Sequence, residues 1–135
     1  MQLKGFDGRT YTFHKKKDND SPSKGHLLAR TLLKQIFPLD IIVEELELPG
    51  TKERFKRNLY ADFFIMRPRL IIEIHGQQHY TYTPFFHSSL QDFIESKKRD
   101  LRKKDWCDLN GFTYVELSDK EDLDEWERKI KSAIE

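Results

Sequence analysis

Two apolar runs separated by only three residues constrain the fold of this chain most strongly. The runs span residues 59–66 and 70–75, and Arg67-Pro68-Arg69 connects them. Short runs rich in branched and aromatic residues are typical of β-strands, and so short a connection joins strands only as an antiparallel hairpin. The sequence therefore predicts a β-hairpin within the core.

Further elements flank this hairpin. A proline after a serine cap predicts a helix that begins at 21–23, with Leu28, Leu32 and Ile36 on its buried face, and Pro38 ends it. The remaining predictions are a β unit at 1–18 with an Asp-Gly turn, a strand at 41–48, a helix at 89–109, a strand at 112–117, and a last helix capped by Ser118 or Asp119 that buries Leu123, Trp126, Ile130 and Ile134. This order predicts an α/β fold, with a mixed sheet flanked by helices over 21–135 and a small β extension over 1–20.

Composition excludes several classes of protein. The 135 residues are enough for one domain, and no apolar stretch approaches the twenty residues of a membrane span. The start carries no pattern of a secretory signal. Cys107 is the single cysteine, which excludes an internal disulfide framework and a four-cysteine zinc site. We therefore expect no membrane partner and a cytoplasmic protein.

Charge is distributed unevenly along the chain. The net charge is +1, but residues 116–135 carry eight acids against four bases, which leaves +5 on residues 1–115. A basic body favours a polyanionic partner, whereas a solvated charged surface is the alternative.

Two acids interrupt the apolar runs. Asp62 and Glu73 each lie in a strand whose neighbours are apolar, where an unpaired carboxylate costs several kcal/mol. Residues two apart share a face of a strand, so Glu73 and His75 point together. If paired residues sum to 135, Asp62 lies opposite Glu73; if they sum to 137, it lies opposite His75. Either register gathers the three side chains on one face.

Adjacent carboxylates repel unless a cation lies between them, and Mg²⁺ binds through oxygen ligands of this kind. The sequence therefore predicts a metal site at Asp62 and Glu73. The structural alternative is that Asp62 pairs with Arg57 or Arg67 at a strand edge.

These acids belong to a longer pattern. It contains Glu44-Glu45, Leu48-Pro49-Gly50, Ala61-Asp62-Phe63-Phe64, Ile72-Glu73-Ile74-His75-Gly76-Gln77-Gln78-His79-Tyr80, Arg99-Asp100-Leu101-Arg102-Lys103, Trp106-Cys107 and Asn110-Gly111-Phe112. Over about residues 21–117 the chain resembles the PD-(D/E)xK nuclease superfamily. The resemblance is to a branch that includes phage-borne homing-type endonucleases and is related to very-short-patch repair endonucleases. It implies a restriction-endonuclease-like fold and a site-specific, metal-dependent DNA endonuclease, in a bacterial or phage-infected host cell.

The resemblance also implies roles for residues. Asp62, Glu73 and the Ile74 carbonyl would hold Mg²⁺, for which Mn²⁺ substitutes. His75 stands where the family carries lysine and would orient the attacking water or accept its proton. Gln78 and His79 would hold the water or the phosphate. Family members often carry a glutamate on the first helix; here His26, or Glu45 on the neighbouring strand, is the candidate third ligand.

Basic residues predict contacts with double-stranded DNA. Arg99, Lys103 and Lys104 crowd one helix, and the resemblance implies that Lys103 lies near the active site. Tyr11 and Phe13 beside Lys15, Lys16 and Lys17 suggest a DNA-contacting arm, whereas a hairpin packed on the core is equally compatible. A chain with one active site needs a homodimer or two successive nicks to break both strands.

Three other interpretations remain open at this point. His75, His79, His87 and Cys107 form a rival zinc set. A nuclease fold with weak or lost turnover would leave a DNA-binding module. The acidic tail would suit an interaction domain whose partner is a protein.

Overall fold

The two apolar runs form the predicted antiparallel hairpin. The structure is a computed structural model that describes residues 1–13, 18, 20–52, 57–76 and 90–135. In it, β4 (Leu59–Ile65) pairs with β5 (Leu70–His75), and Phe63 lies opposite Ile72. Paired residues sum to 135, so the first of the two expected registers is confirmed.

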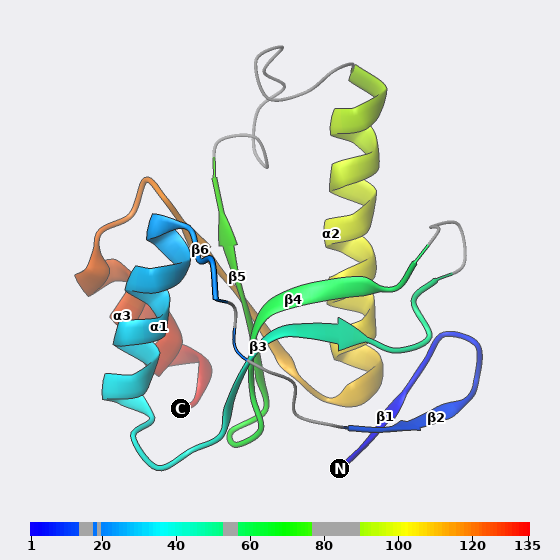
Figure 1. Ribbon diagram of the computed structural model, residues 1–135, viewed down its shortest axis with the longest axis horizontal. Helices are drawn as coiled ribbons and strands as arrows, with labels where there is room; N and C mark the ends of the chain where they lie inside the picture. The colour runs from blue at the N-terminus through cyan, green and yellow to red at the C-terminus, as the bar shows by residue number, and fades with distance from the viewer. Residues whose placement is uncertain (14–17, 19, 53–56, 77–89) are drawn as a thin grey trace.

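Two further strands complete a four-stranded mixed sheet. β3 (Ile42–Leu48) pairs antiparallel with β4, and β6 (Thr113–Ser118) pairs parallel with β5, which gives the order β3-β4-β5-β6. Figure 1 shows α1 (Lys24–Ile36) and α3 (Leu123–Ala133) on one side of the sheet and α2 (Leu90–Asn110) on the other. Because β5 and β6 are parallel, the chain must cross over between them, and α2 lies in that crossover. The predicted α/β architecture is confirmed.

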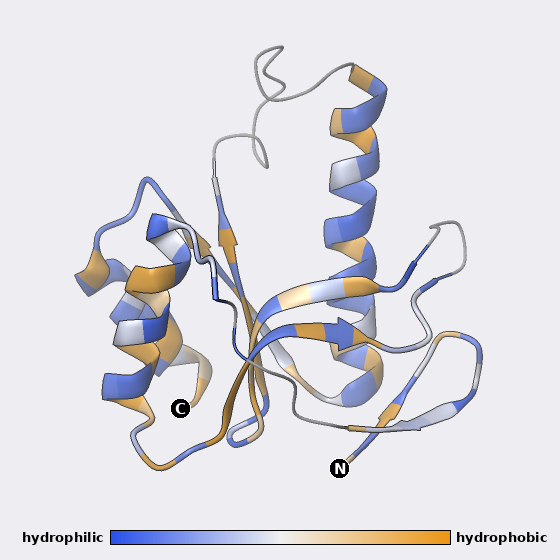
Figure 2. Cartoon of the chain, viewed as in Figure 1, coloured by the Kyte–Doolittle hydropathy of each residue, from blue (hydrophilic) through white to orange (hydrophobic). Residues whose placement is uncertain are grey.

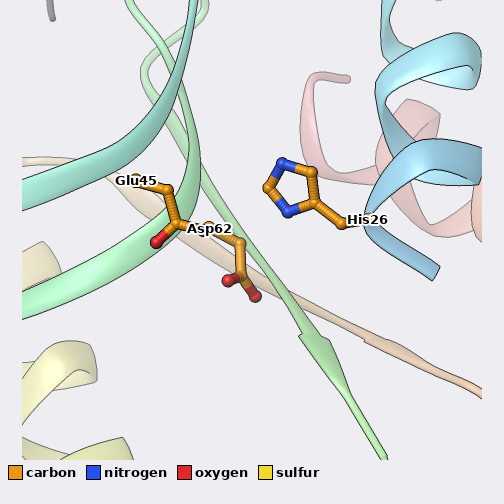
Figure 3. A group of neighbouring side chains, drawn as sticks. All are labelled: His26, Glu45 and Asp62. Atoms are coloured by element: carbon orange, nitrogen blue, oxygen red, sulfur yellow. The ribbon is translucent and has the colours of Figure 1, made fainter. Parts of the chain in front are cut away.

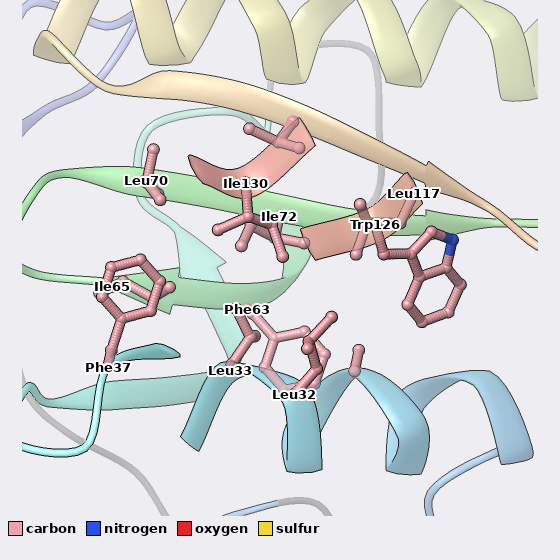
Figure 4. Close-up of a cluster of buried hydrophobic side chains, with 12 residues drawn as sticks. Leu32, Leu33, Phe37, Phe63, Ile65, Leu70, Ile72, Leu117, Trp126 and Ile130 are labelled. Atoms are coloured by element: carbon pink, nitrogen blue, oxygen red, sulfur yellow. The ribbon is translucent and has the colours of Figure 1, made fainter. Parts of the chain in front are cut away.

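Each face of the sheet carries its own apolar cluster. The face toward α1 and α3 buries Ala29, Leu32, Leu33, Phe37, Phe63, Ile65, Leu70, Ile72, Val115, Leu117, Trp126 and Ile130 (Figure 4). The face toward α2 buries Leu3, Val43, Leu46, Leu48, Leu59, Ala61, Phe64, Ile71, Trp106, Cys107 and Phe112. β4 and β5 are therefore covered on both sides, which explains why their sequences are apolar runs without alternation.

The amino-terminal hairpin packs on the core. β1 (Gln2–Lys4) pairs antiparallel with β2 (Thr10–Thr12), and Leu3 is 2% exposed. The Asn110 amide of α2 accepts from the Lys4 N–H (2.6 Å) and donates to the Lys4 carbonyl (2.9 Å). Residues 1–13 thus follow the packed-hairpin alternative. Lys15, Lys16 and Lys17 lie outside the described residues, so their DNA contacts stay a prediction.

Both caps predicted for the short helices were wrong. The Ser23 hydroxyl, and not Ser21 ahead of the proline, accepts from the His26 N–H (3.2 Å) and starts α1. The Asp122 carboxylate starts α3 by accepting from the Glu125 N–H (2.8 Å). Ser118, one of the two expected caps of α3, ends β6 instead.

The buried face of the first helix also differs from the prediction. Leu28 is 39% exposed, whereas His26 is only 4% exposed and shares the inward face with Ala29 and Leu33. In α3, Trp126 and Ile130 are buried as predicted, but Leu123 and the C-cap residue Ile134 are exposed. The rotation of α1 matters because it turns an imidazole toward the sheet.

α2 is hydrophilic along most of its length (Figure 2). Its buried side chains are Asp100, Trp106 and Cys107. Across the described ranges, no helix combines the length and the apolar character that a membrane span needs.

Candidate metal centre

Asp62 and Glu73 meet directly beyond the last backbone pair of the β4–β5 hairpin. The Asp62 N–H donates to Glu73 Oε2 (3.3 Å), and the Ile74 N–H donates to Asp62 Oδ2 (2.9 Å). Backbone pairing between β4 and β5 stops at Phe63 and Ile72. Beyond that pair, the backbone N–H groups of Asp62 and Ile74 donate to side-chain carboxylates and not to backbone carbonyls of the neighbouring strand. The predicted meeting of these acids is confirmed, and Asp62 bonds to the backbone of β5.

Glu73 is buried against a lysine from the opposite layer. The residue is 3% exposed, and Lys103 Nζ of α2 lies 2.6 Å from Oε1. Burial, together with the nearby charge of Asp62, raises the pKa of Glu73 well above its usual range, and Lys103 offsets this only in part. A further positive charge beside Glu73 would therefore lower the pKa of this acid toward its usual range.

Glu45 and His26 approach Asp62 from two other elements. Each of the three side chains offers one ligand atom, and these atoms all lie within 4.8 Å of one another. Figure 3 shows the ring of His26 turned from α1 toward Asp62 on β4, with Glu45 on the neighbouring β3. Both candidates for the third ligand thus belong to one cluster. With Glu73, the site gathers three carboxylates, and Lys103 is paired with one of them.

The backbone at Glu45 departs from regular strand geometry. Its φ is 53°, in the left-handed region that costs a residue with a side chain roughly 1–3 kcal/mol. The irregularity lies between the pairs Glu44–Phe63 and Leu46–Ala61, which places it opposite Asp62. Backbone strain of this kind clusters at active sites, ligand-binding sites and switch regions, where the surrounding structure stabilises the strained conformation.

His26 is held from several directions. Its ring stacks on Phe63 with centroids 4.3 Å apart, and its Nε2 lies 2.9 Å from Glu44 Oε1. A Cβ added to the preceding Gly25 would lie 3.2 Å from Ile74 Cγ2, so a glycine suits this close approach of α1 to β5. The imidazole is therefore placed by packing as well as by hydrogen bonding.

Glu44 is in turn held by Arg30. The guanidinium donates from Nε and Nη2 to the two carboxylate oxygens, both at 2.7 Å. Burial alone would raise the pKa of Glu44, but the bonds from Arg30 and His26 outweigh it and lower the pKa. Sequence reasoning missed the roles of Glu44 and Arg30. The i,i+4 spacing of His26 and Arg30, which puts both on one helix face, is the pattern that could have pointed to Arg30.

His75 is buried beside Glu73 but contacts a different strand. Its Nε2 lies 3.4 Å from the Tyr114 hydroxyl and its Nδ1 lies 3.8 Å from Glu116 Oε2. His75, which stands where the family carries lysine, therefore faces β6. The positive charge next to Glu73 comes from Lys103 instead. Gln78 and His79 lie outside the described residues.

The basic residues of α2 divide into two groups. Lys103 points into the site, whereas Lys104 is exposed and its Nζ lies 3.0 Å from Glu116 Oε1. Arg99 is half-buried one turn earlier on the helix. The helix thus directs Lys103 to Glu73 of β5 and Lys104 to Glu116 of β6.

Cys107 is unsuited to the rival zinc set. It is fully buried in the apolar cluster facing α2, and burial raises the pKa of its thiol to about 12. Zinc binds the thiolate, which this environment disfavours. His79 and His87 lie outside the described residues.

Comparisons with known proteins give relatives of undefined activity. Over 60 residues the chain is 33% identical to uncharacterized protein 307L of Invertebrate iridescent virus 6, a match that covers 44% of this chain and 30% of the relative. Over 101 residues it is 28% identical to uncharacterized protein 033L of Invertebrate iridescent virus 3, a match that covers 70% of this chain and 48% of the relative. The chain thus spans less than half the length of these relatives. No family model matches it. No solved structure matches it either.

Proposed function

We propose that this protein is a metal-dependent endonuclease that hydrolyses phosphodiester bonds of double-stranded DNA. The observation that carries the proposal is the convergence of Asp62 and Glu73 where β4 and β5 separate, with Lys103 on one side and Glu45 and His26 on the other. Membership of the PD-(D/E)xK superfamily, homing-type specificity and action as a homodimer are parts of the same proposal.

The donor set fits a divalent cation. Oxygen ligands from Asp62, Glu45 and Glu73 suit Mg²⁺ or Mn²⁺, and a bound ion would offset the burial and the Asp62 charge that disfavour ionisation of Glu73. Such an ion stabilises charge on the transferred phosphoryl group and lowers the pKa of a bound water.

The remaining groups of the site act on the phosphate and the water. Lys103, at 2.6 Å from Glu73, is close enough to donate to a non-bridging phosphate oxygen or to orient the attacking water. His75 is the proton acceptor that the resemblance implies, from its buried position next to Tyr114. Arg99 and Lys104 would contact the duplex backbone beside the site.

The decisive test is cleavage of supercoiled plasmid with Mg²⁺ or Mn²⁺, run beside duplex binding. Wild-type protein is expected to nick or linearise the plasmid, and Asp62→Asn is expected to bind duplex without cutting it. Glu47→Gln is the matched control, because Glu47 lies on β3 but contacts Asn58 (2.9 Å) outside the cluster. Its cleavage should equal that of the wild type.

The outcomes separate the remaining alternatives. Binding without cleavage by the wild type would identify a DNA-binding module that has lost turnover. The absence of both would point to the protein-interaction alternative. Cleavage by Asp62→Asn at the wild-type rate would refute the assigned site.

A further inference from the structure

We propose that His26 is a metal ligand through Nδ1, that Glu44 and Arg30 are positioning residues which fix its ring, and that the site therefore prefers Mn²⁺ to Mg²⁺. This inference rests on the proposed function for the existence of a metal site. It adds the identity of a nitrogen ligand, the residues that orient it, and the class of ion that the site takes.

Hydrogen bonding determines which ring nitrogen is available. Glu44 accepts two bonds from the Arg30 guanidinium, so it is held as a carboxylate and can only accept a hydrogen bond from His26. The Nε2 of His26 lies 2.9 Å from Glu44 Oε1 and must therefore carry the hydrogen. In the neutral ring the lone pair is then on Nδ1. Carboxylates fix ligating histidines in the same way at known metal sites.

The ring is oriented so that Nδ1 faces the acids. In Figure 3 the nitrogen next to the ring carbon that bears Cβ is on the side toward Asp62. Stacking on Phe63 and an exposure of 4% leave the imidazole little freedom to rotate. A chain of contacts from Arg30 through Glu44 to His26 thus ends within the cluster that contains Asp62 and Glu45.

One imidazole among carboxylates changes the preferred ion. Mg²⁺ favours an all-oxygen shell, whereas first-row transition ions accept imidazole readily. Mn²⁺ tolerates both donor types and binds carboxylates well. The described donor set of His26, Glu45 and Asp62 is therefore better matched to Mn²⁺ than to Mg²⁺.

A purely structural histidine is the competing explanation. A buried imidazole that only satisfied Glu44 and packed on Phe63 would need no ligand at Nδ1. The two explanations differ in one observable, which is direct coordination of ring nitrogen to the ion.

The experiment uses the full chain freed of metal. Mn²⁺ binding is titrated by the electron paramagnetic resonance of the free ion, with Mg²⁺ as competitor. Electron spin-echo envelope modulation then reports whether nitrogen coordinates the bound Mn²⁺. We expect a nitrogen signature in the wild type and its loss in His26→Gln.

The positioning residues are tested by affinity. Glu44→Ala is expected to weaken Mn²⁺ binding by roughly 10–100-fold, as for other carboxylates behind a ligating histidine. Glu44→Gln, which keeps an acceptor for Nε2, should lose less. Glu47→Ala on the same strand should bind as the wild type does. If Glu44→Ala does not fold, the wild-type nitrogen signature and Glu44→Gln still decide.

The inference and the proposed function fail differently. Bound Mn²⁺ without a nitrogen signature, or equal affinity for Mg²⁺ and Mn²⁺, overturns the inference even if the protein cuts DNA. A nitrogen signature that depends on His26 supports the inference even if no DNA is cut, and the proposed nuclease activity would then be the part that is wrong. A chain that binds neither ion overturns both.

Discussion

The Asp62 N–H donates to the Glu73 carboxylate, while the Asp62 carboxylate accepts from the N–H of Ile74, the residue after Glu73. These reciprocal bonds hold the two acids side by side through the backbone, independently of any ion. Because like charges so close repel, the metal-free protein should carry an electrostatic penalty that a cation removes.

Metal should therefore stabilise the fold. An ion at a hundred times its Kd adds about 2.7 kcal/mol to the free energy of unfolding, since it binds the folded chain alone. Urea unfolding with Mn²⁺ and with a chelator measures the difference in the free energy of unfolding. For Asp62→Asn this difference should be small. Equal stabilisation of Asp62→Asn and wild type would place the ion elsewhere.

Glu73→Gln should stabilise the metal-free protein at neutral pH. The pKa of Glu73 is raised in the folded state, so the folded chain binds the proton more tightly than the unfolded chain does. The contribution of Glu73 to stability is then complete below its ordinary pKa of about 4.5 and is lost as the pH rises through the folded-state pKa.

Unfolding curves of both proteins between pH 4 and pH 8 test this sign. The advantage of Glu73→Gln should grow as the pH rises through this range. A constant difference across the range would show that Lys103 fully compensates the buried charge.

Glu45→Gly and Glu45→Ala should separate strain from function. Both variants remove the carboxylate, but only glycine accepts a φ of 53° without cost. We expect Glu45→Gly to be more stable than Glu45→Ala by about 1 kcal/mol, and both to lose metal affinity. Chemical unfolding and Mn²⁺ titration measure the two effects. Equal stability of the two variants would indicate that the backbone relaxes at this position.

Lys103→Ala should lower cleavage by roughly 10²–10³-fold, as expected for the loss of a donor to developing charge. Lys98→Ala is the control, because Lys98 is exposed on the same helix. Plasmid nicking rates at saturating metal compare the two. A rate for Lys103→Ala close to that of Lys98→Ala would confine Lys103 to a structural role.

Removing exposed basic groups of α2 should change the salt dependence of DNA binding. Each lost phosphate contact lowers the slope of log K against log salt by about 0.9. Lys104→Ala is expected to show this change, whereas Lys34→Ala, exposed on α1, is not. Binding to one duplex at several salt concentrations provides the slopes. Parallel slopes for all proteins would exclude α2 from the interface.

Local pattern was enough to predict the sheet and the acids on it. The three-residue connection predicted the hairpin and narrowed its register to two candidates, of which the structure has the one whose paired residues sum to 135. Both candidate registers predicted that Asp62 and Glu73 share one face of the sheet, and the family resemblance gave Glu45 and His26 as candidate ligands. Helix caps were predicted poorly, because several serines and aspartates near each end satisfy the same preference.

The order of apolar and charged residues along the chain by itself predicted the strands, the hairpin of β4 and β5 and the two acids within it, since these depend on neighbours in sequence. Only the tertiary structure decided that Lys103, and not His75, reaches Glu73, and that Arg30 and Glu44 hold His26 toward Asp62. The hydrogen-bonded residues in those contacts are 14 to 30 positions apart in the sequence. Their geometry depends on how α1 and α2 are rotated over the sheet, which is set by side-chain packing of both apolar clusters and not by any local pattern.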